Sequence, residues 1–192
     1  MGRRVFDVAA SLLGILITSP LWILAALAIV LTSHGPVFFR QERMGRHFQP
    51  FRIVKFRTMS DGTDVAPLTA RGDQRVTMVG RFLRLTKIDE LPQLLNVLTG
   101  EMSIVGPRPE LSQFVELFRS DYEELLQVRP GITDEASIAF RHEDAILATS
   151  TDPQKLYRES ILPQKIAMSK QYQKRRTLAR DLWVILRTLA RL

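Results

Sequence analysis

The sequence predicts a mainly helical α+β protein, in which helices surround a small β-sheet and an apolar N-terminal segment comes first. Three observations support this fold class. Residues 8–33 contain no charged side chain. Two short aromatic and β-branched runs follow, and patterns with a helical period fill much of the remaining chain.

The charge-free run is long for a soluble core helix and predicts a membrane segment. As a straight helix of about 24 residues it would measure ~36 Å, enough to cross a bilayer. A secretory signal peptide is a second interpretation, because residues 26–28 resemble a cleavage site, although the apolar run continues beyond them. A re-entrant hairpin is the third, because Ser19 and Pro20 lie near the centre and proline disrupts helices.

Positive charge on both sides of the apolar run favours the hairpin. Arg3 and Arg4 precede it, and a series of arginines begins at Arg40 after it. Positive flanks mark the cytoplasmic side, so both ends are expected on that side. We therefore predict that residues 1–36 form a re-entrant membrane anchor and that residues 37–192 form a cytosolic or interfacial domain.

The rest of the chain divides into short elements. Residues 37–40 and 51–56 are predicted strands joined near Gly45, and residues 61–73 are a predicted loop. Helices are predicted over residues 77–85, from Asp89 to a stop at Gly100, over 110–128, and over most of 157–192. The last of these carries a leucine-rich stripe with interspersed arginines and Trp183 from residue 174 onward. Such an amphipathic helix either lies in a membrane interface or packs on the domain with a solvated basic face.

Composition limits the chemistry. The chain has 192 residues, a net charge of +7 and no cysteine. The absence of cysteine excludes disulfides, thiolate catalysis and cysteine-bound zinc. The basic excess indicates partners that carry phosphate, such as nucleotides, anionic lipids or nucleic acids.

Adjacent carboxylates at the start of a predicted helix form the candidate site. Asp89 and Glu90 can divide the work of attack on phosphorus and of binding Mg²⁺ or moving a proton, although a simple helix cap is the alternative interpretation. Phosphoryl transfer requires clustered cations. Several lie in the surrounding segments: Lys55, Arg57, Arg71, Arg75, Arg81, Arg84 and Arg108.

Three segments carry a family resemblance: KFRTM (55–59), DELPQLLNVLTGEMSIVGPRPE (89–110) and RPGIT (129–133). They resemble the bacterial sugar transferase family, the monotopic phosphoglycosyl transferases that act on undecaprenyl phosphate. The resemblance implies a re-entrant anchor that breaks at Ser19 and Pro20, at the cytoplasmic face of the bacterial inner membrane. It implies transfer of a sugar 1-phosphate from a UDP-sugar to undecaprenyl phosphate, with release of UMP, as the first step of glycan assembly.

The same resemblance implies roles for single residues. Asp89 would be the nucleophile that carries the sugar phosphate, and Glu90 would bind Mg²⁺ together with Asp89 or accept a proton. Segments that bind nucleotide or phosphate contribute Lys55, Arg57, Arg75, Arg108 and Arg141. Membrane lipids are the further partners implied, nucleic acid is not, and a homodimer is left open. The chain departs from the family pattern at Asp134, Glu135 and residues 136–143, where sugar or nucleotide recognition is in question.

Two other functions compete with this one. A non-enzymatic basic module, anchored in the membrane and binding lipid or nucleic acid, would explain the charge and the apolar segment but not residues 89–110. An anchored nucleotide-sugar hydrolase would use similar residues without requiring a lipid phosphate. Loss of activity in Asp89→Asn separates an enzyme from the module.

Overall fold

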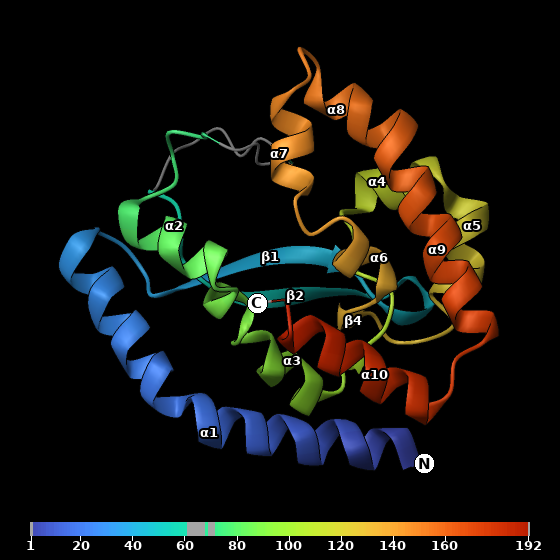
Figure 1. Cartoon of the computed structure of the whole chain (residues 1–192), viewed down its shortest axis with the longest axis horizontal. Helices are drawn as coiled ribbons and strands as arrows, with labels where there is room; N and C mark the ends of the chain where they lie inside the picture. Colours follow the sequence, from blue (N-terminus) through green and yellow to red (C-terminus); the bar gives the residue numbers. More distant parts are fainter. Residues whose placement is uncertain (1, 61–67, 69–71, 192) are drawn as a thin grey trace.

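The computed structural model describes residues 2–60, 68 and 72–191. It has the predicted mainly helical α+β fold, with two small sheets among helices (Figure 1). The predicted loop over residues 61–73 lies for the most part outside the described residues.

The apolar segment forms one long helix, α1 (Gly2–Thr32), with Pro20 inside it. Proline cannot donate a hydrogen bond to the Leu16 carbonyl one turn earlier, and the Ser19 hydroxyl donates to that carbonyl instead, at 2.9 Å. The helix therefore continues through the expected break, and Figure 1 shows it changing direction near its middle. The two predicted halves are parts of a single bent helix.

Polar contacts fasten the beginning of α1 to the domain. The Asp7 carboxylate is buried and accepts hydrogen bonds from the Ser103 hydroxyl at 2.9 Å and from the Ile104 backbone N–H at 3.1 Å. Arg4 donates to the Leu98 carbonyl at 2.8 Å. By length and composition α1 as a whole could cross a membrane, and most of its apolar window is exposed in the chain alone.

The two predicted strands pair as an antiparallel hairpin. They are β1 (Phe38–Met44) and β2 (Pro50–Phe56), and the turn at Gly45 and the 3₁₀ helix Arg46–Phe48 connect them. The side chain of Asn96 contacts β2 through both polar atoms, accepting from the Val54 N–H at 3.0 Å and donating to the Arg52 carbonyl at 2.8 Å. These bonds fix the helix that carries Asn96, α3 (Gln93–Thr99), beside the strand that carries Lys55.

A second sheet was absent from the sequence prediction. Strands β3 (Ser103–Val105) and β4 (Gly131–Thr133) are parallel neighbours. The single helix predicted over residues 110–128 is also wrong, because two helices, α4 (Ser112–Leu117) and α5 (Arg119–Leu125), meet at the non-helical backbone of Phe118. The loop between β3 and α4 contains Arg108, so this region positions a candidate site residue.

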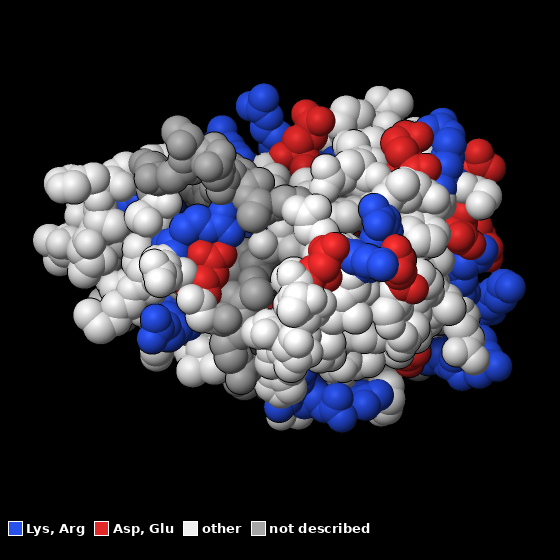
Figure 2. All heavy atoms as spheres, turned by 90° about the horizontal axis from the view of Figure 1, so that it is seen from above, with Lys and Arg blue, Asp and Glu red and all other residues white. Residues whose placement is uncertain are grey.

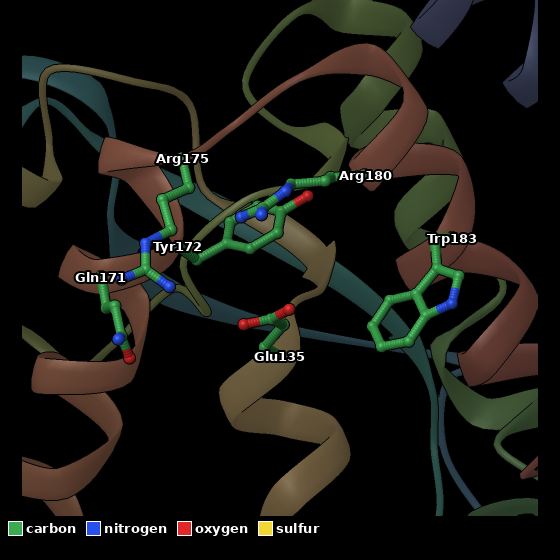
Figure 3. A pocket seen from close by; sticks show the side chains of 6 residues that line it. All are labelled: Glu135, Gln171, Tyr172, Arg175, Arg180 and Trp183. Carbon is green, nitrogen blue, oxygen red and sulfur yellow. The ribbon is translucent and has the colours of Figure 1, made fainter.

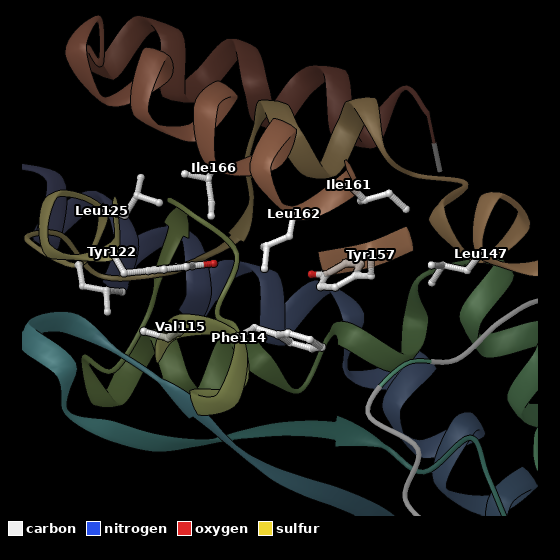
Figure 4. Close-up of a cluster of buried hydrophobic side chains, with 10 residues drawn as sticks. Phe114, Val115, Tyr122, Leu125, Leu147, Tyr157, Ile161, Leu162 and Ile166 are labelled. Carbon is white, nitrogen blue, oxygen red and sulfur yellow. The ribbon is translucent and has the colours of Figure 1, made fainter. Parts of the chain in front are cut away.

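The remaining helices complete the domain. The predicted helix over residues 77–85 is α2 (Met78–Leu85), which Thr77 caps by accepting from the Gly80 N–H. Residues 157–189 are mostly helical, as predicted, and three further short helices precede them. These elements are α6 (Glu135–Ala139), α7 (Glu143–Ala148), α8 (Pro153–Leu156), a π-helical turn (Tyr157–Ile161), α9 (Leu162–Lys174) and α10 (Leu178–Leu189). Figure 4 shows the largest apolar cluster, where α9 and the π-helical turn pack on α4 and α5.

Candidate active site

The two adjacent carboxylates lie in a 3₁₀ turn, η2 (Ile88–Glu90), and not in the first turn of an α-helix. The α-helix α3 begins only at Gln93, after Pro92, so the predicted helix start at Asp89 was four residues early. Its predicted end at Gly100 is confirmed, with φ of 91°. Lys87 precedes η2 with φ of 56°, a backbone conformation that costs energy for a residue with a side chain. This left-handed residue sets the turn that comes directly before the two carboxylates.

Glu90 is held by two cations that come from distant parts of the chain. Its Oε1 atom lies 2.8 Å from Lys55 Nζ on β2 and 3.0 Å from an Arg108 guanidinium nitrogen. Burial by itself raises the pKa of a carboxyl, but Arg108, Lys55 and Lys87 outweigh it and hold the pKa of Glu90 well below its ordinary value. Glu90 is therefore a carboxylate at neutral pH.

Asp89 has the opposite electrostatic environment. Its side chain is buried, and its Oδ1 atom has no hydrogen-bond partner within the described ranges. Burial raises the pKa of Asp89 to about 6, and the neighbouring charge of Glu90 adds to this, against the opposing charge of Lys55. A desolvated carboxylate with one unpartnered oxygen is suited to act as a nucleophile or to bind a metal ion.

A further arginine, Arg84 on α2, lies within electrostatic reach of Asp89. Its Nε donates to the Thr58 hydroxyl at 2.8 Å, and burial lowers its pKa against the favourable charges of Asp89 and Asp73. Figure 2 shows acidic and basic side chains together at a hollow in the molecular surface. Sequence reasoning noted the positive charge of Arg84 but did not place it in the site.

A polar network that includes Glu110 and Glu143 lies within electrostatic reach of Arg108. The Tyr157 hydroxyl donates to Glu110 at 2.5 Å, and Lys165 pairs with Glu143 at 2.8 Å while donating to the same hydroxyl at 3.3 Å. Glu90 contributes most to the raised pKa of Arg108, and Glu143 and Glu110 add to it. Arg108 thus contacts Glu90 directly and lies within electrostatic reach of Glu143 and Glu110. No local sequence pattern indicated this network.

The family model for bacterial sugar transferases matches residues 1–192. This chain belongs to the bacterial sugar transferase family. Members of this family are sugar phosphotransferases, so the chain is an enzyme of that class.

Curated relatives name related activities. The UDP-glucose:undecaprenyl-phosphate glucose-1-phosphate transferase of Caulobacter vibrioides is 45% identical over 97% of this chain and 68% of its own length. The enzyme of the same name from Escherichia coli is 45% identical over 71% of this chain and 30% of its own length. A UDP-N-acetylgalactosamine-undecaprenyl-phosphate N-acetylgalactosaminephosphotransferase of Aeromonas hydrophila is 43% identical over 71% of this chain and 33% of its own length. The chain thus spans about two thirds of the first relative and about a third of the other two.

In this sugar transferase, two of the five predicted substrate-binding cations contact the carboxylate pair, namely Lys55 and Arg108. The other three have different contacts. Arg57 is buried and donates to the Ser33 carbonyl and hydroxyl, both at 2.9 Å, so it holds the end of α1. Arg75 pairs with Asp73 at 2.6 Å, and the exposed Arg141 donates to His142 at 2.8 Å.

The residues of the site fit a Mg²⁺ ion that two carboxylates share with the phosphates of a substrate. Across the described ranges, no group of three or more histidine, aspartate or glutamate side chains gathers at one point. Mg²⁺ is often bound by one or two carboxylates together with substrate phosphates. The unpartnered Oδ1 of Asp89 and the adjacent Glu90 carboxylate fit that arrangement.

Proposed function

We propose that this sugar transferase moves a sugar 1-phosphate from a UDP-sugar to undecaprenyl phosphate and releases UMP, which initiates glycan assembly. The observation that carries the proposal is the pair of adjacent carboxylates with opposite pKa shifts, set among Lys55, Arg108 and Arg84. The relatives' names supply the substrate class, since they pair UDP-sugars with undecaprenyl phosphate. They differ in the sugar, so the sugar of this chain is left to experiment.

Asp89 would react in two steps. In the first, a carboxylate oxygen attacks the β-phosphorus of the UDP-sugar, and the bond from that phosphorus to the bridging oxygen breaks. UMP leaves with the electron pair, and the sugar phosphate stays on Asp89. In the second, an oxygen of the lipid phosphate attacks the same phosphorus, the bond to Asp89 breaks and the carboxylate is restored. A covalent step of this kind lets a soluble donor and a membrane acceptor react one after the other.

The cations around the pair supply electrostatic stabilisation. Lys55 and Arg108 lie within 3.0 Å of Glu90 and can move part of their hydrogen bonding to phosphate oxygens when the donor binds. Glu90 keeps both cations in place and would hold Mg²⁺ together with Asp89. When bound, Mg²⁺ would offset the negative charge of the diphosphate.

The membrane placement is part of the proposal. The long apolar α1 supports an anchor over residues 1–36, with residues 37–192 as the catalytic domain at the cytoplasmic face of the bacterial inner membrane. A monotopic anchor would keep the site at the level where a lipid phosphate can reach it. The Asp7 and Arg4 contacts join this anchor directly to the domain.

Release of UMP tests the function. The detergent-solubilised chain is incubated with Mg²⁺ and each of several UDP-sugars, with and without undecaprenyl phosphate. Release that depends on the lipid, and that Asp89→Asn abolishes, is the expected result and identifies the sugar. Glu116→Gln, an exposed carboxylate on α4, is the matched control and should keep full activity. Turnover without lipid would indicate a hydrolase, and no turnover with any donor would contradict the proposal.

A further inference from the structure

A cavity of about 380 Å³ lies where α9 turns into α10, and none of the residues placed in the active site lines it. Its lining consists of Glu135, Gln171, Tyr172, Arg175, Arg180 and Trp183. Figure 3 shows these side chains arranged around a shared space, with Arg175 and Trp183 on opposite sides of it. The lining thus combines two cations, one carboxylate, one side-chain amide and two aromatic rings.

The charged groups of this cavity are not used within the protein. Within the described ranges, the guanidinium groups of Arg175 and Arg180 and the carboxylate of Glu135 have no hydrogen-bond or ion-pair partner. Arg176, between the two arginines in sequence, behaves differently: it pairs with Asp181 at 3.1 Å and donates to the Val105 carbonyl at 2.6 Å. Arg176 therefore builds the α9–α10 turn, while its two neighbours are free to bind a ligand.

The cavity lies near the N-terminal end of α1, the helix of the proposed membrane anchor. Arg3 on α1 pairs with Asp181 of α10 at 3.3 Å and donates to the Arg176 carbonyl at 3.1 Å. The outer side of α10 is apolar and exposed, with Leu186 64% exposed and Trp183, at the cavity edge, 49% exposed. Tryptophan prefers the interface between water and hydrocarbon. Under the proposed membrane association, the exposed apolar side of α10 and Trp183 put the cavity at the depth of lipid head groups.

We propose that this cavity binds the phosphoethanolamine head group of a membrane phospholipid. The phosphate lies between Arg175 and Arg180, whose guanidinium groups suit a phosphodiester, and the ammonium group faces Glu135. Phosphatidylglycerol is anionic and has no ammonium group. Its phosphate would therefore lie near the Glu135 carboxylate with no positive group of the lipid to pair with that carboxylate. Binding here would fix α10 in the interface and so set the height of the catalytic domain above the membrane. The inference rests on the proposed membrane association.

Fluorescence quenching in vesicles tests the site. The chain has two tryptophans, so Trp22→Phe leaves Trp183 as the only indole. The full-length Trp22→Phe protein is reconstituted in phosphatidylcholine vesicles that contain increasing fractions of brominated phosphatidylethanolamine or brominated phosphatidylglycerol. Because the protein is basic, nonspecific attraction favours phosphatidylglycerol. Half-maximal quenching at a lower fraction of phosphatidylethanolamine is the result expected from a dedicated site.

Charge variants in the same background identify the residues. Arg175→Gln together with Arg180→Gln should raise the half-quenching fraction of phosphatidylethanolamine about tenfold, through loss of charge-assisted hydrogen bonds. Lys155→Gln together with Arg158→Gln removes the same charge from an exposed region and should change nothing. Glu135→Gln should abolish the preference for phosphatidylethanolamine over phosphatidylglycerol.

Equal quenching by both lipids would overturn the inference, and so would an Arg175/Arg180 double variant that behaves like the Lys155/Arg158 control. Recovery of fluorescence on adding millimolar inorganic phosphate would also overturn it, because it would indicate a site for the free anion. Flotation of the vesicles with the protein separates this inference from the proposed membrane association. A chain that does not float refutes the anchor, whereas a chain that floats without lipid preference refutes only the head-group site.

Discussion

Replacement of Asp89 by asparagine is expected to stabilise the protein while abolishing activity. The pKa of Asp89 is raised from 3.8 to about 6, which means that its ionisation costs more in the folded than in the unfolded chain. A difference of this size corresponds to about 3 kcal/mol. The contribution of Asp89 to the free energy of unfolding is thus fully present at pH values below 3.8, its pKa in the unfolded chain. It is lost as the pH rises through about 6, its pKa in the folded protein. Asparagine cannot ionise, so the variant avoids this loss.

The assay is urea unfolding of the detergent-solubilised protein at pH 8 and near pH 4. At pH 8, Asp89→Asn should increase the free energy of unfolding by about 1–3 kcal/mol, and near pH 4 the gain should nearly vanish. The matched variant is Glu90→Gln. The pKa of Glu90 is held well below its ordinary value, so its ionised form stabilises the fold at pH 8. Removing this charge leaves Lys55 and Arg108 without their partner and should cost about 1–3 kcal/mol.

The opposite signs of these two effects are the decisive feature. If both carboxylates were merely structural, replacing either one by its amide would change the free energy of unfolding at pH 8 in the same direction. A loss of stability at pH 8 in Asp89→Asn, comparable to that in Glu90→Gln, would refute the electrostatic reasoning.

Further predictions concern the pH profile, the anchor and the second sheet. The rate of UMP release at low donor concentration should fall about tenfold per pH unit below about 6, because only ionised Asp89 can attack; a flat profile down to pH 5 would contradict this. Asp7→Leu removes the acceptor for the Ser103 hydroxyl and the Ile104 N–H, and should lower the free energy of unfolding in urea by about 2–4 kcal/mol. Gly131→Ala places a Cβ 2.1 Å from the Gly106 nitrogen and should cost at least about 3 kcal/mol by separating β3 from β4. Gly2→Ala meets no atom within 4 Å and should lie within about 0.5 kcal/mol of the parent; equal midpoints for the two alanine variants would contradict the close approach.

Local signals account for the parts of the fold that could be predicted from sequence. The apolar run, the two aromatic strands around Gly45 and the helix capped by Thr77 each carry their pattern within a few neighbouring residues. The bend in α1 was expected at Pro20, but the compensating Ser19 hydroxyl that keeps the helix continuous was not. Proline predicts a weakened helix, and only the neighbouring side chains decide whether it ends.

Non-local contacts account for what the sequence could not predict. Strands β3 and β4 have three residues each, too few to show a period, and exist because they pair with one another. The contacts of Glu90 with Lys55 and Arg108 join residues 35 and 18 positions apart. The choice of these two cations over Arg57 follows from the packing of α1, whose end Arg57 holds. The Glu110–Tyr157–Lys165 network likewise has no local signal.

The central claim, that Asp89 carries the sugar phosphate, is tested most directly by the intact mass of the protein after incubation with its UDP-sugar and Mg²⁺ in the absence of lipid. We expect a mass gain of one sugar phosphate, located on the peptide that contains Asp89. The gain should disappear on addition of undecaprenyl phosphate and should be absent from Asp89→Asn. Lipid-dependent UMP release without any mass gain, or a sugar phosphate on another residue, would contradict the account.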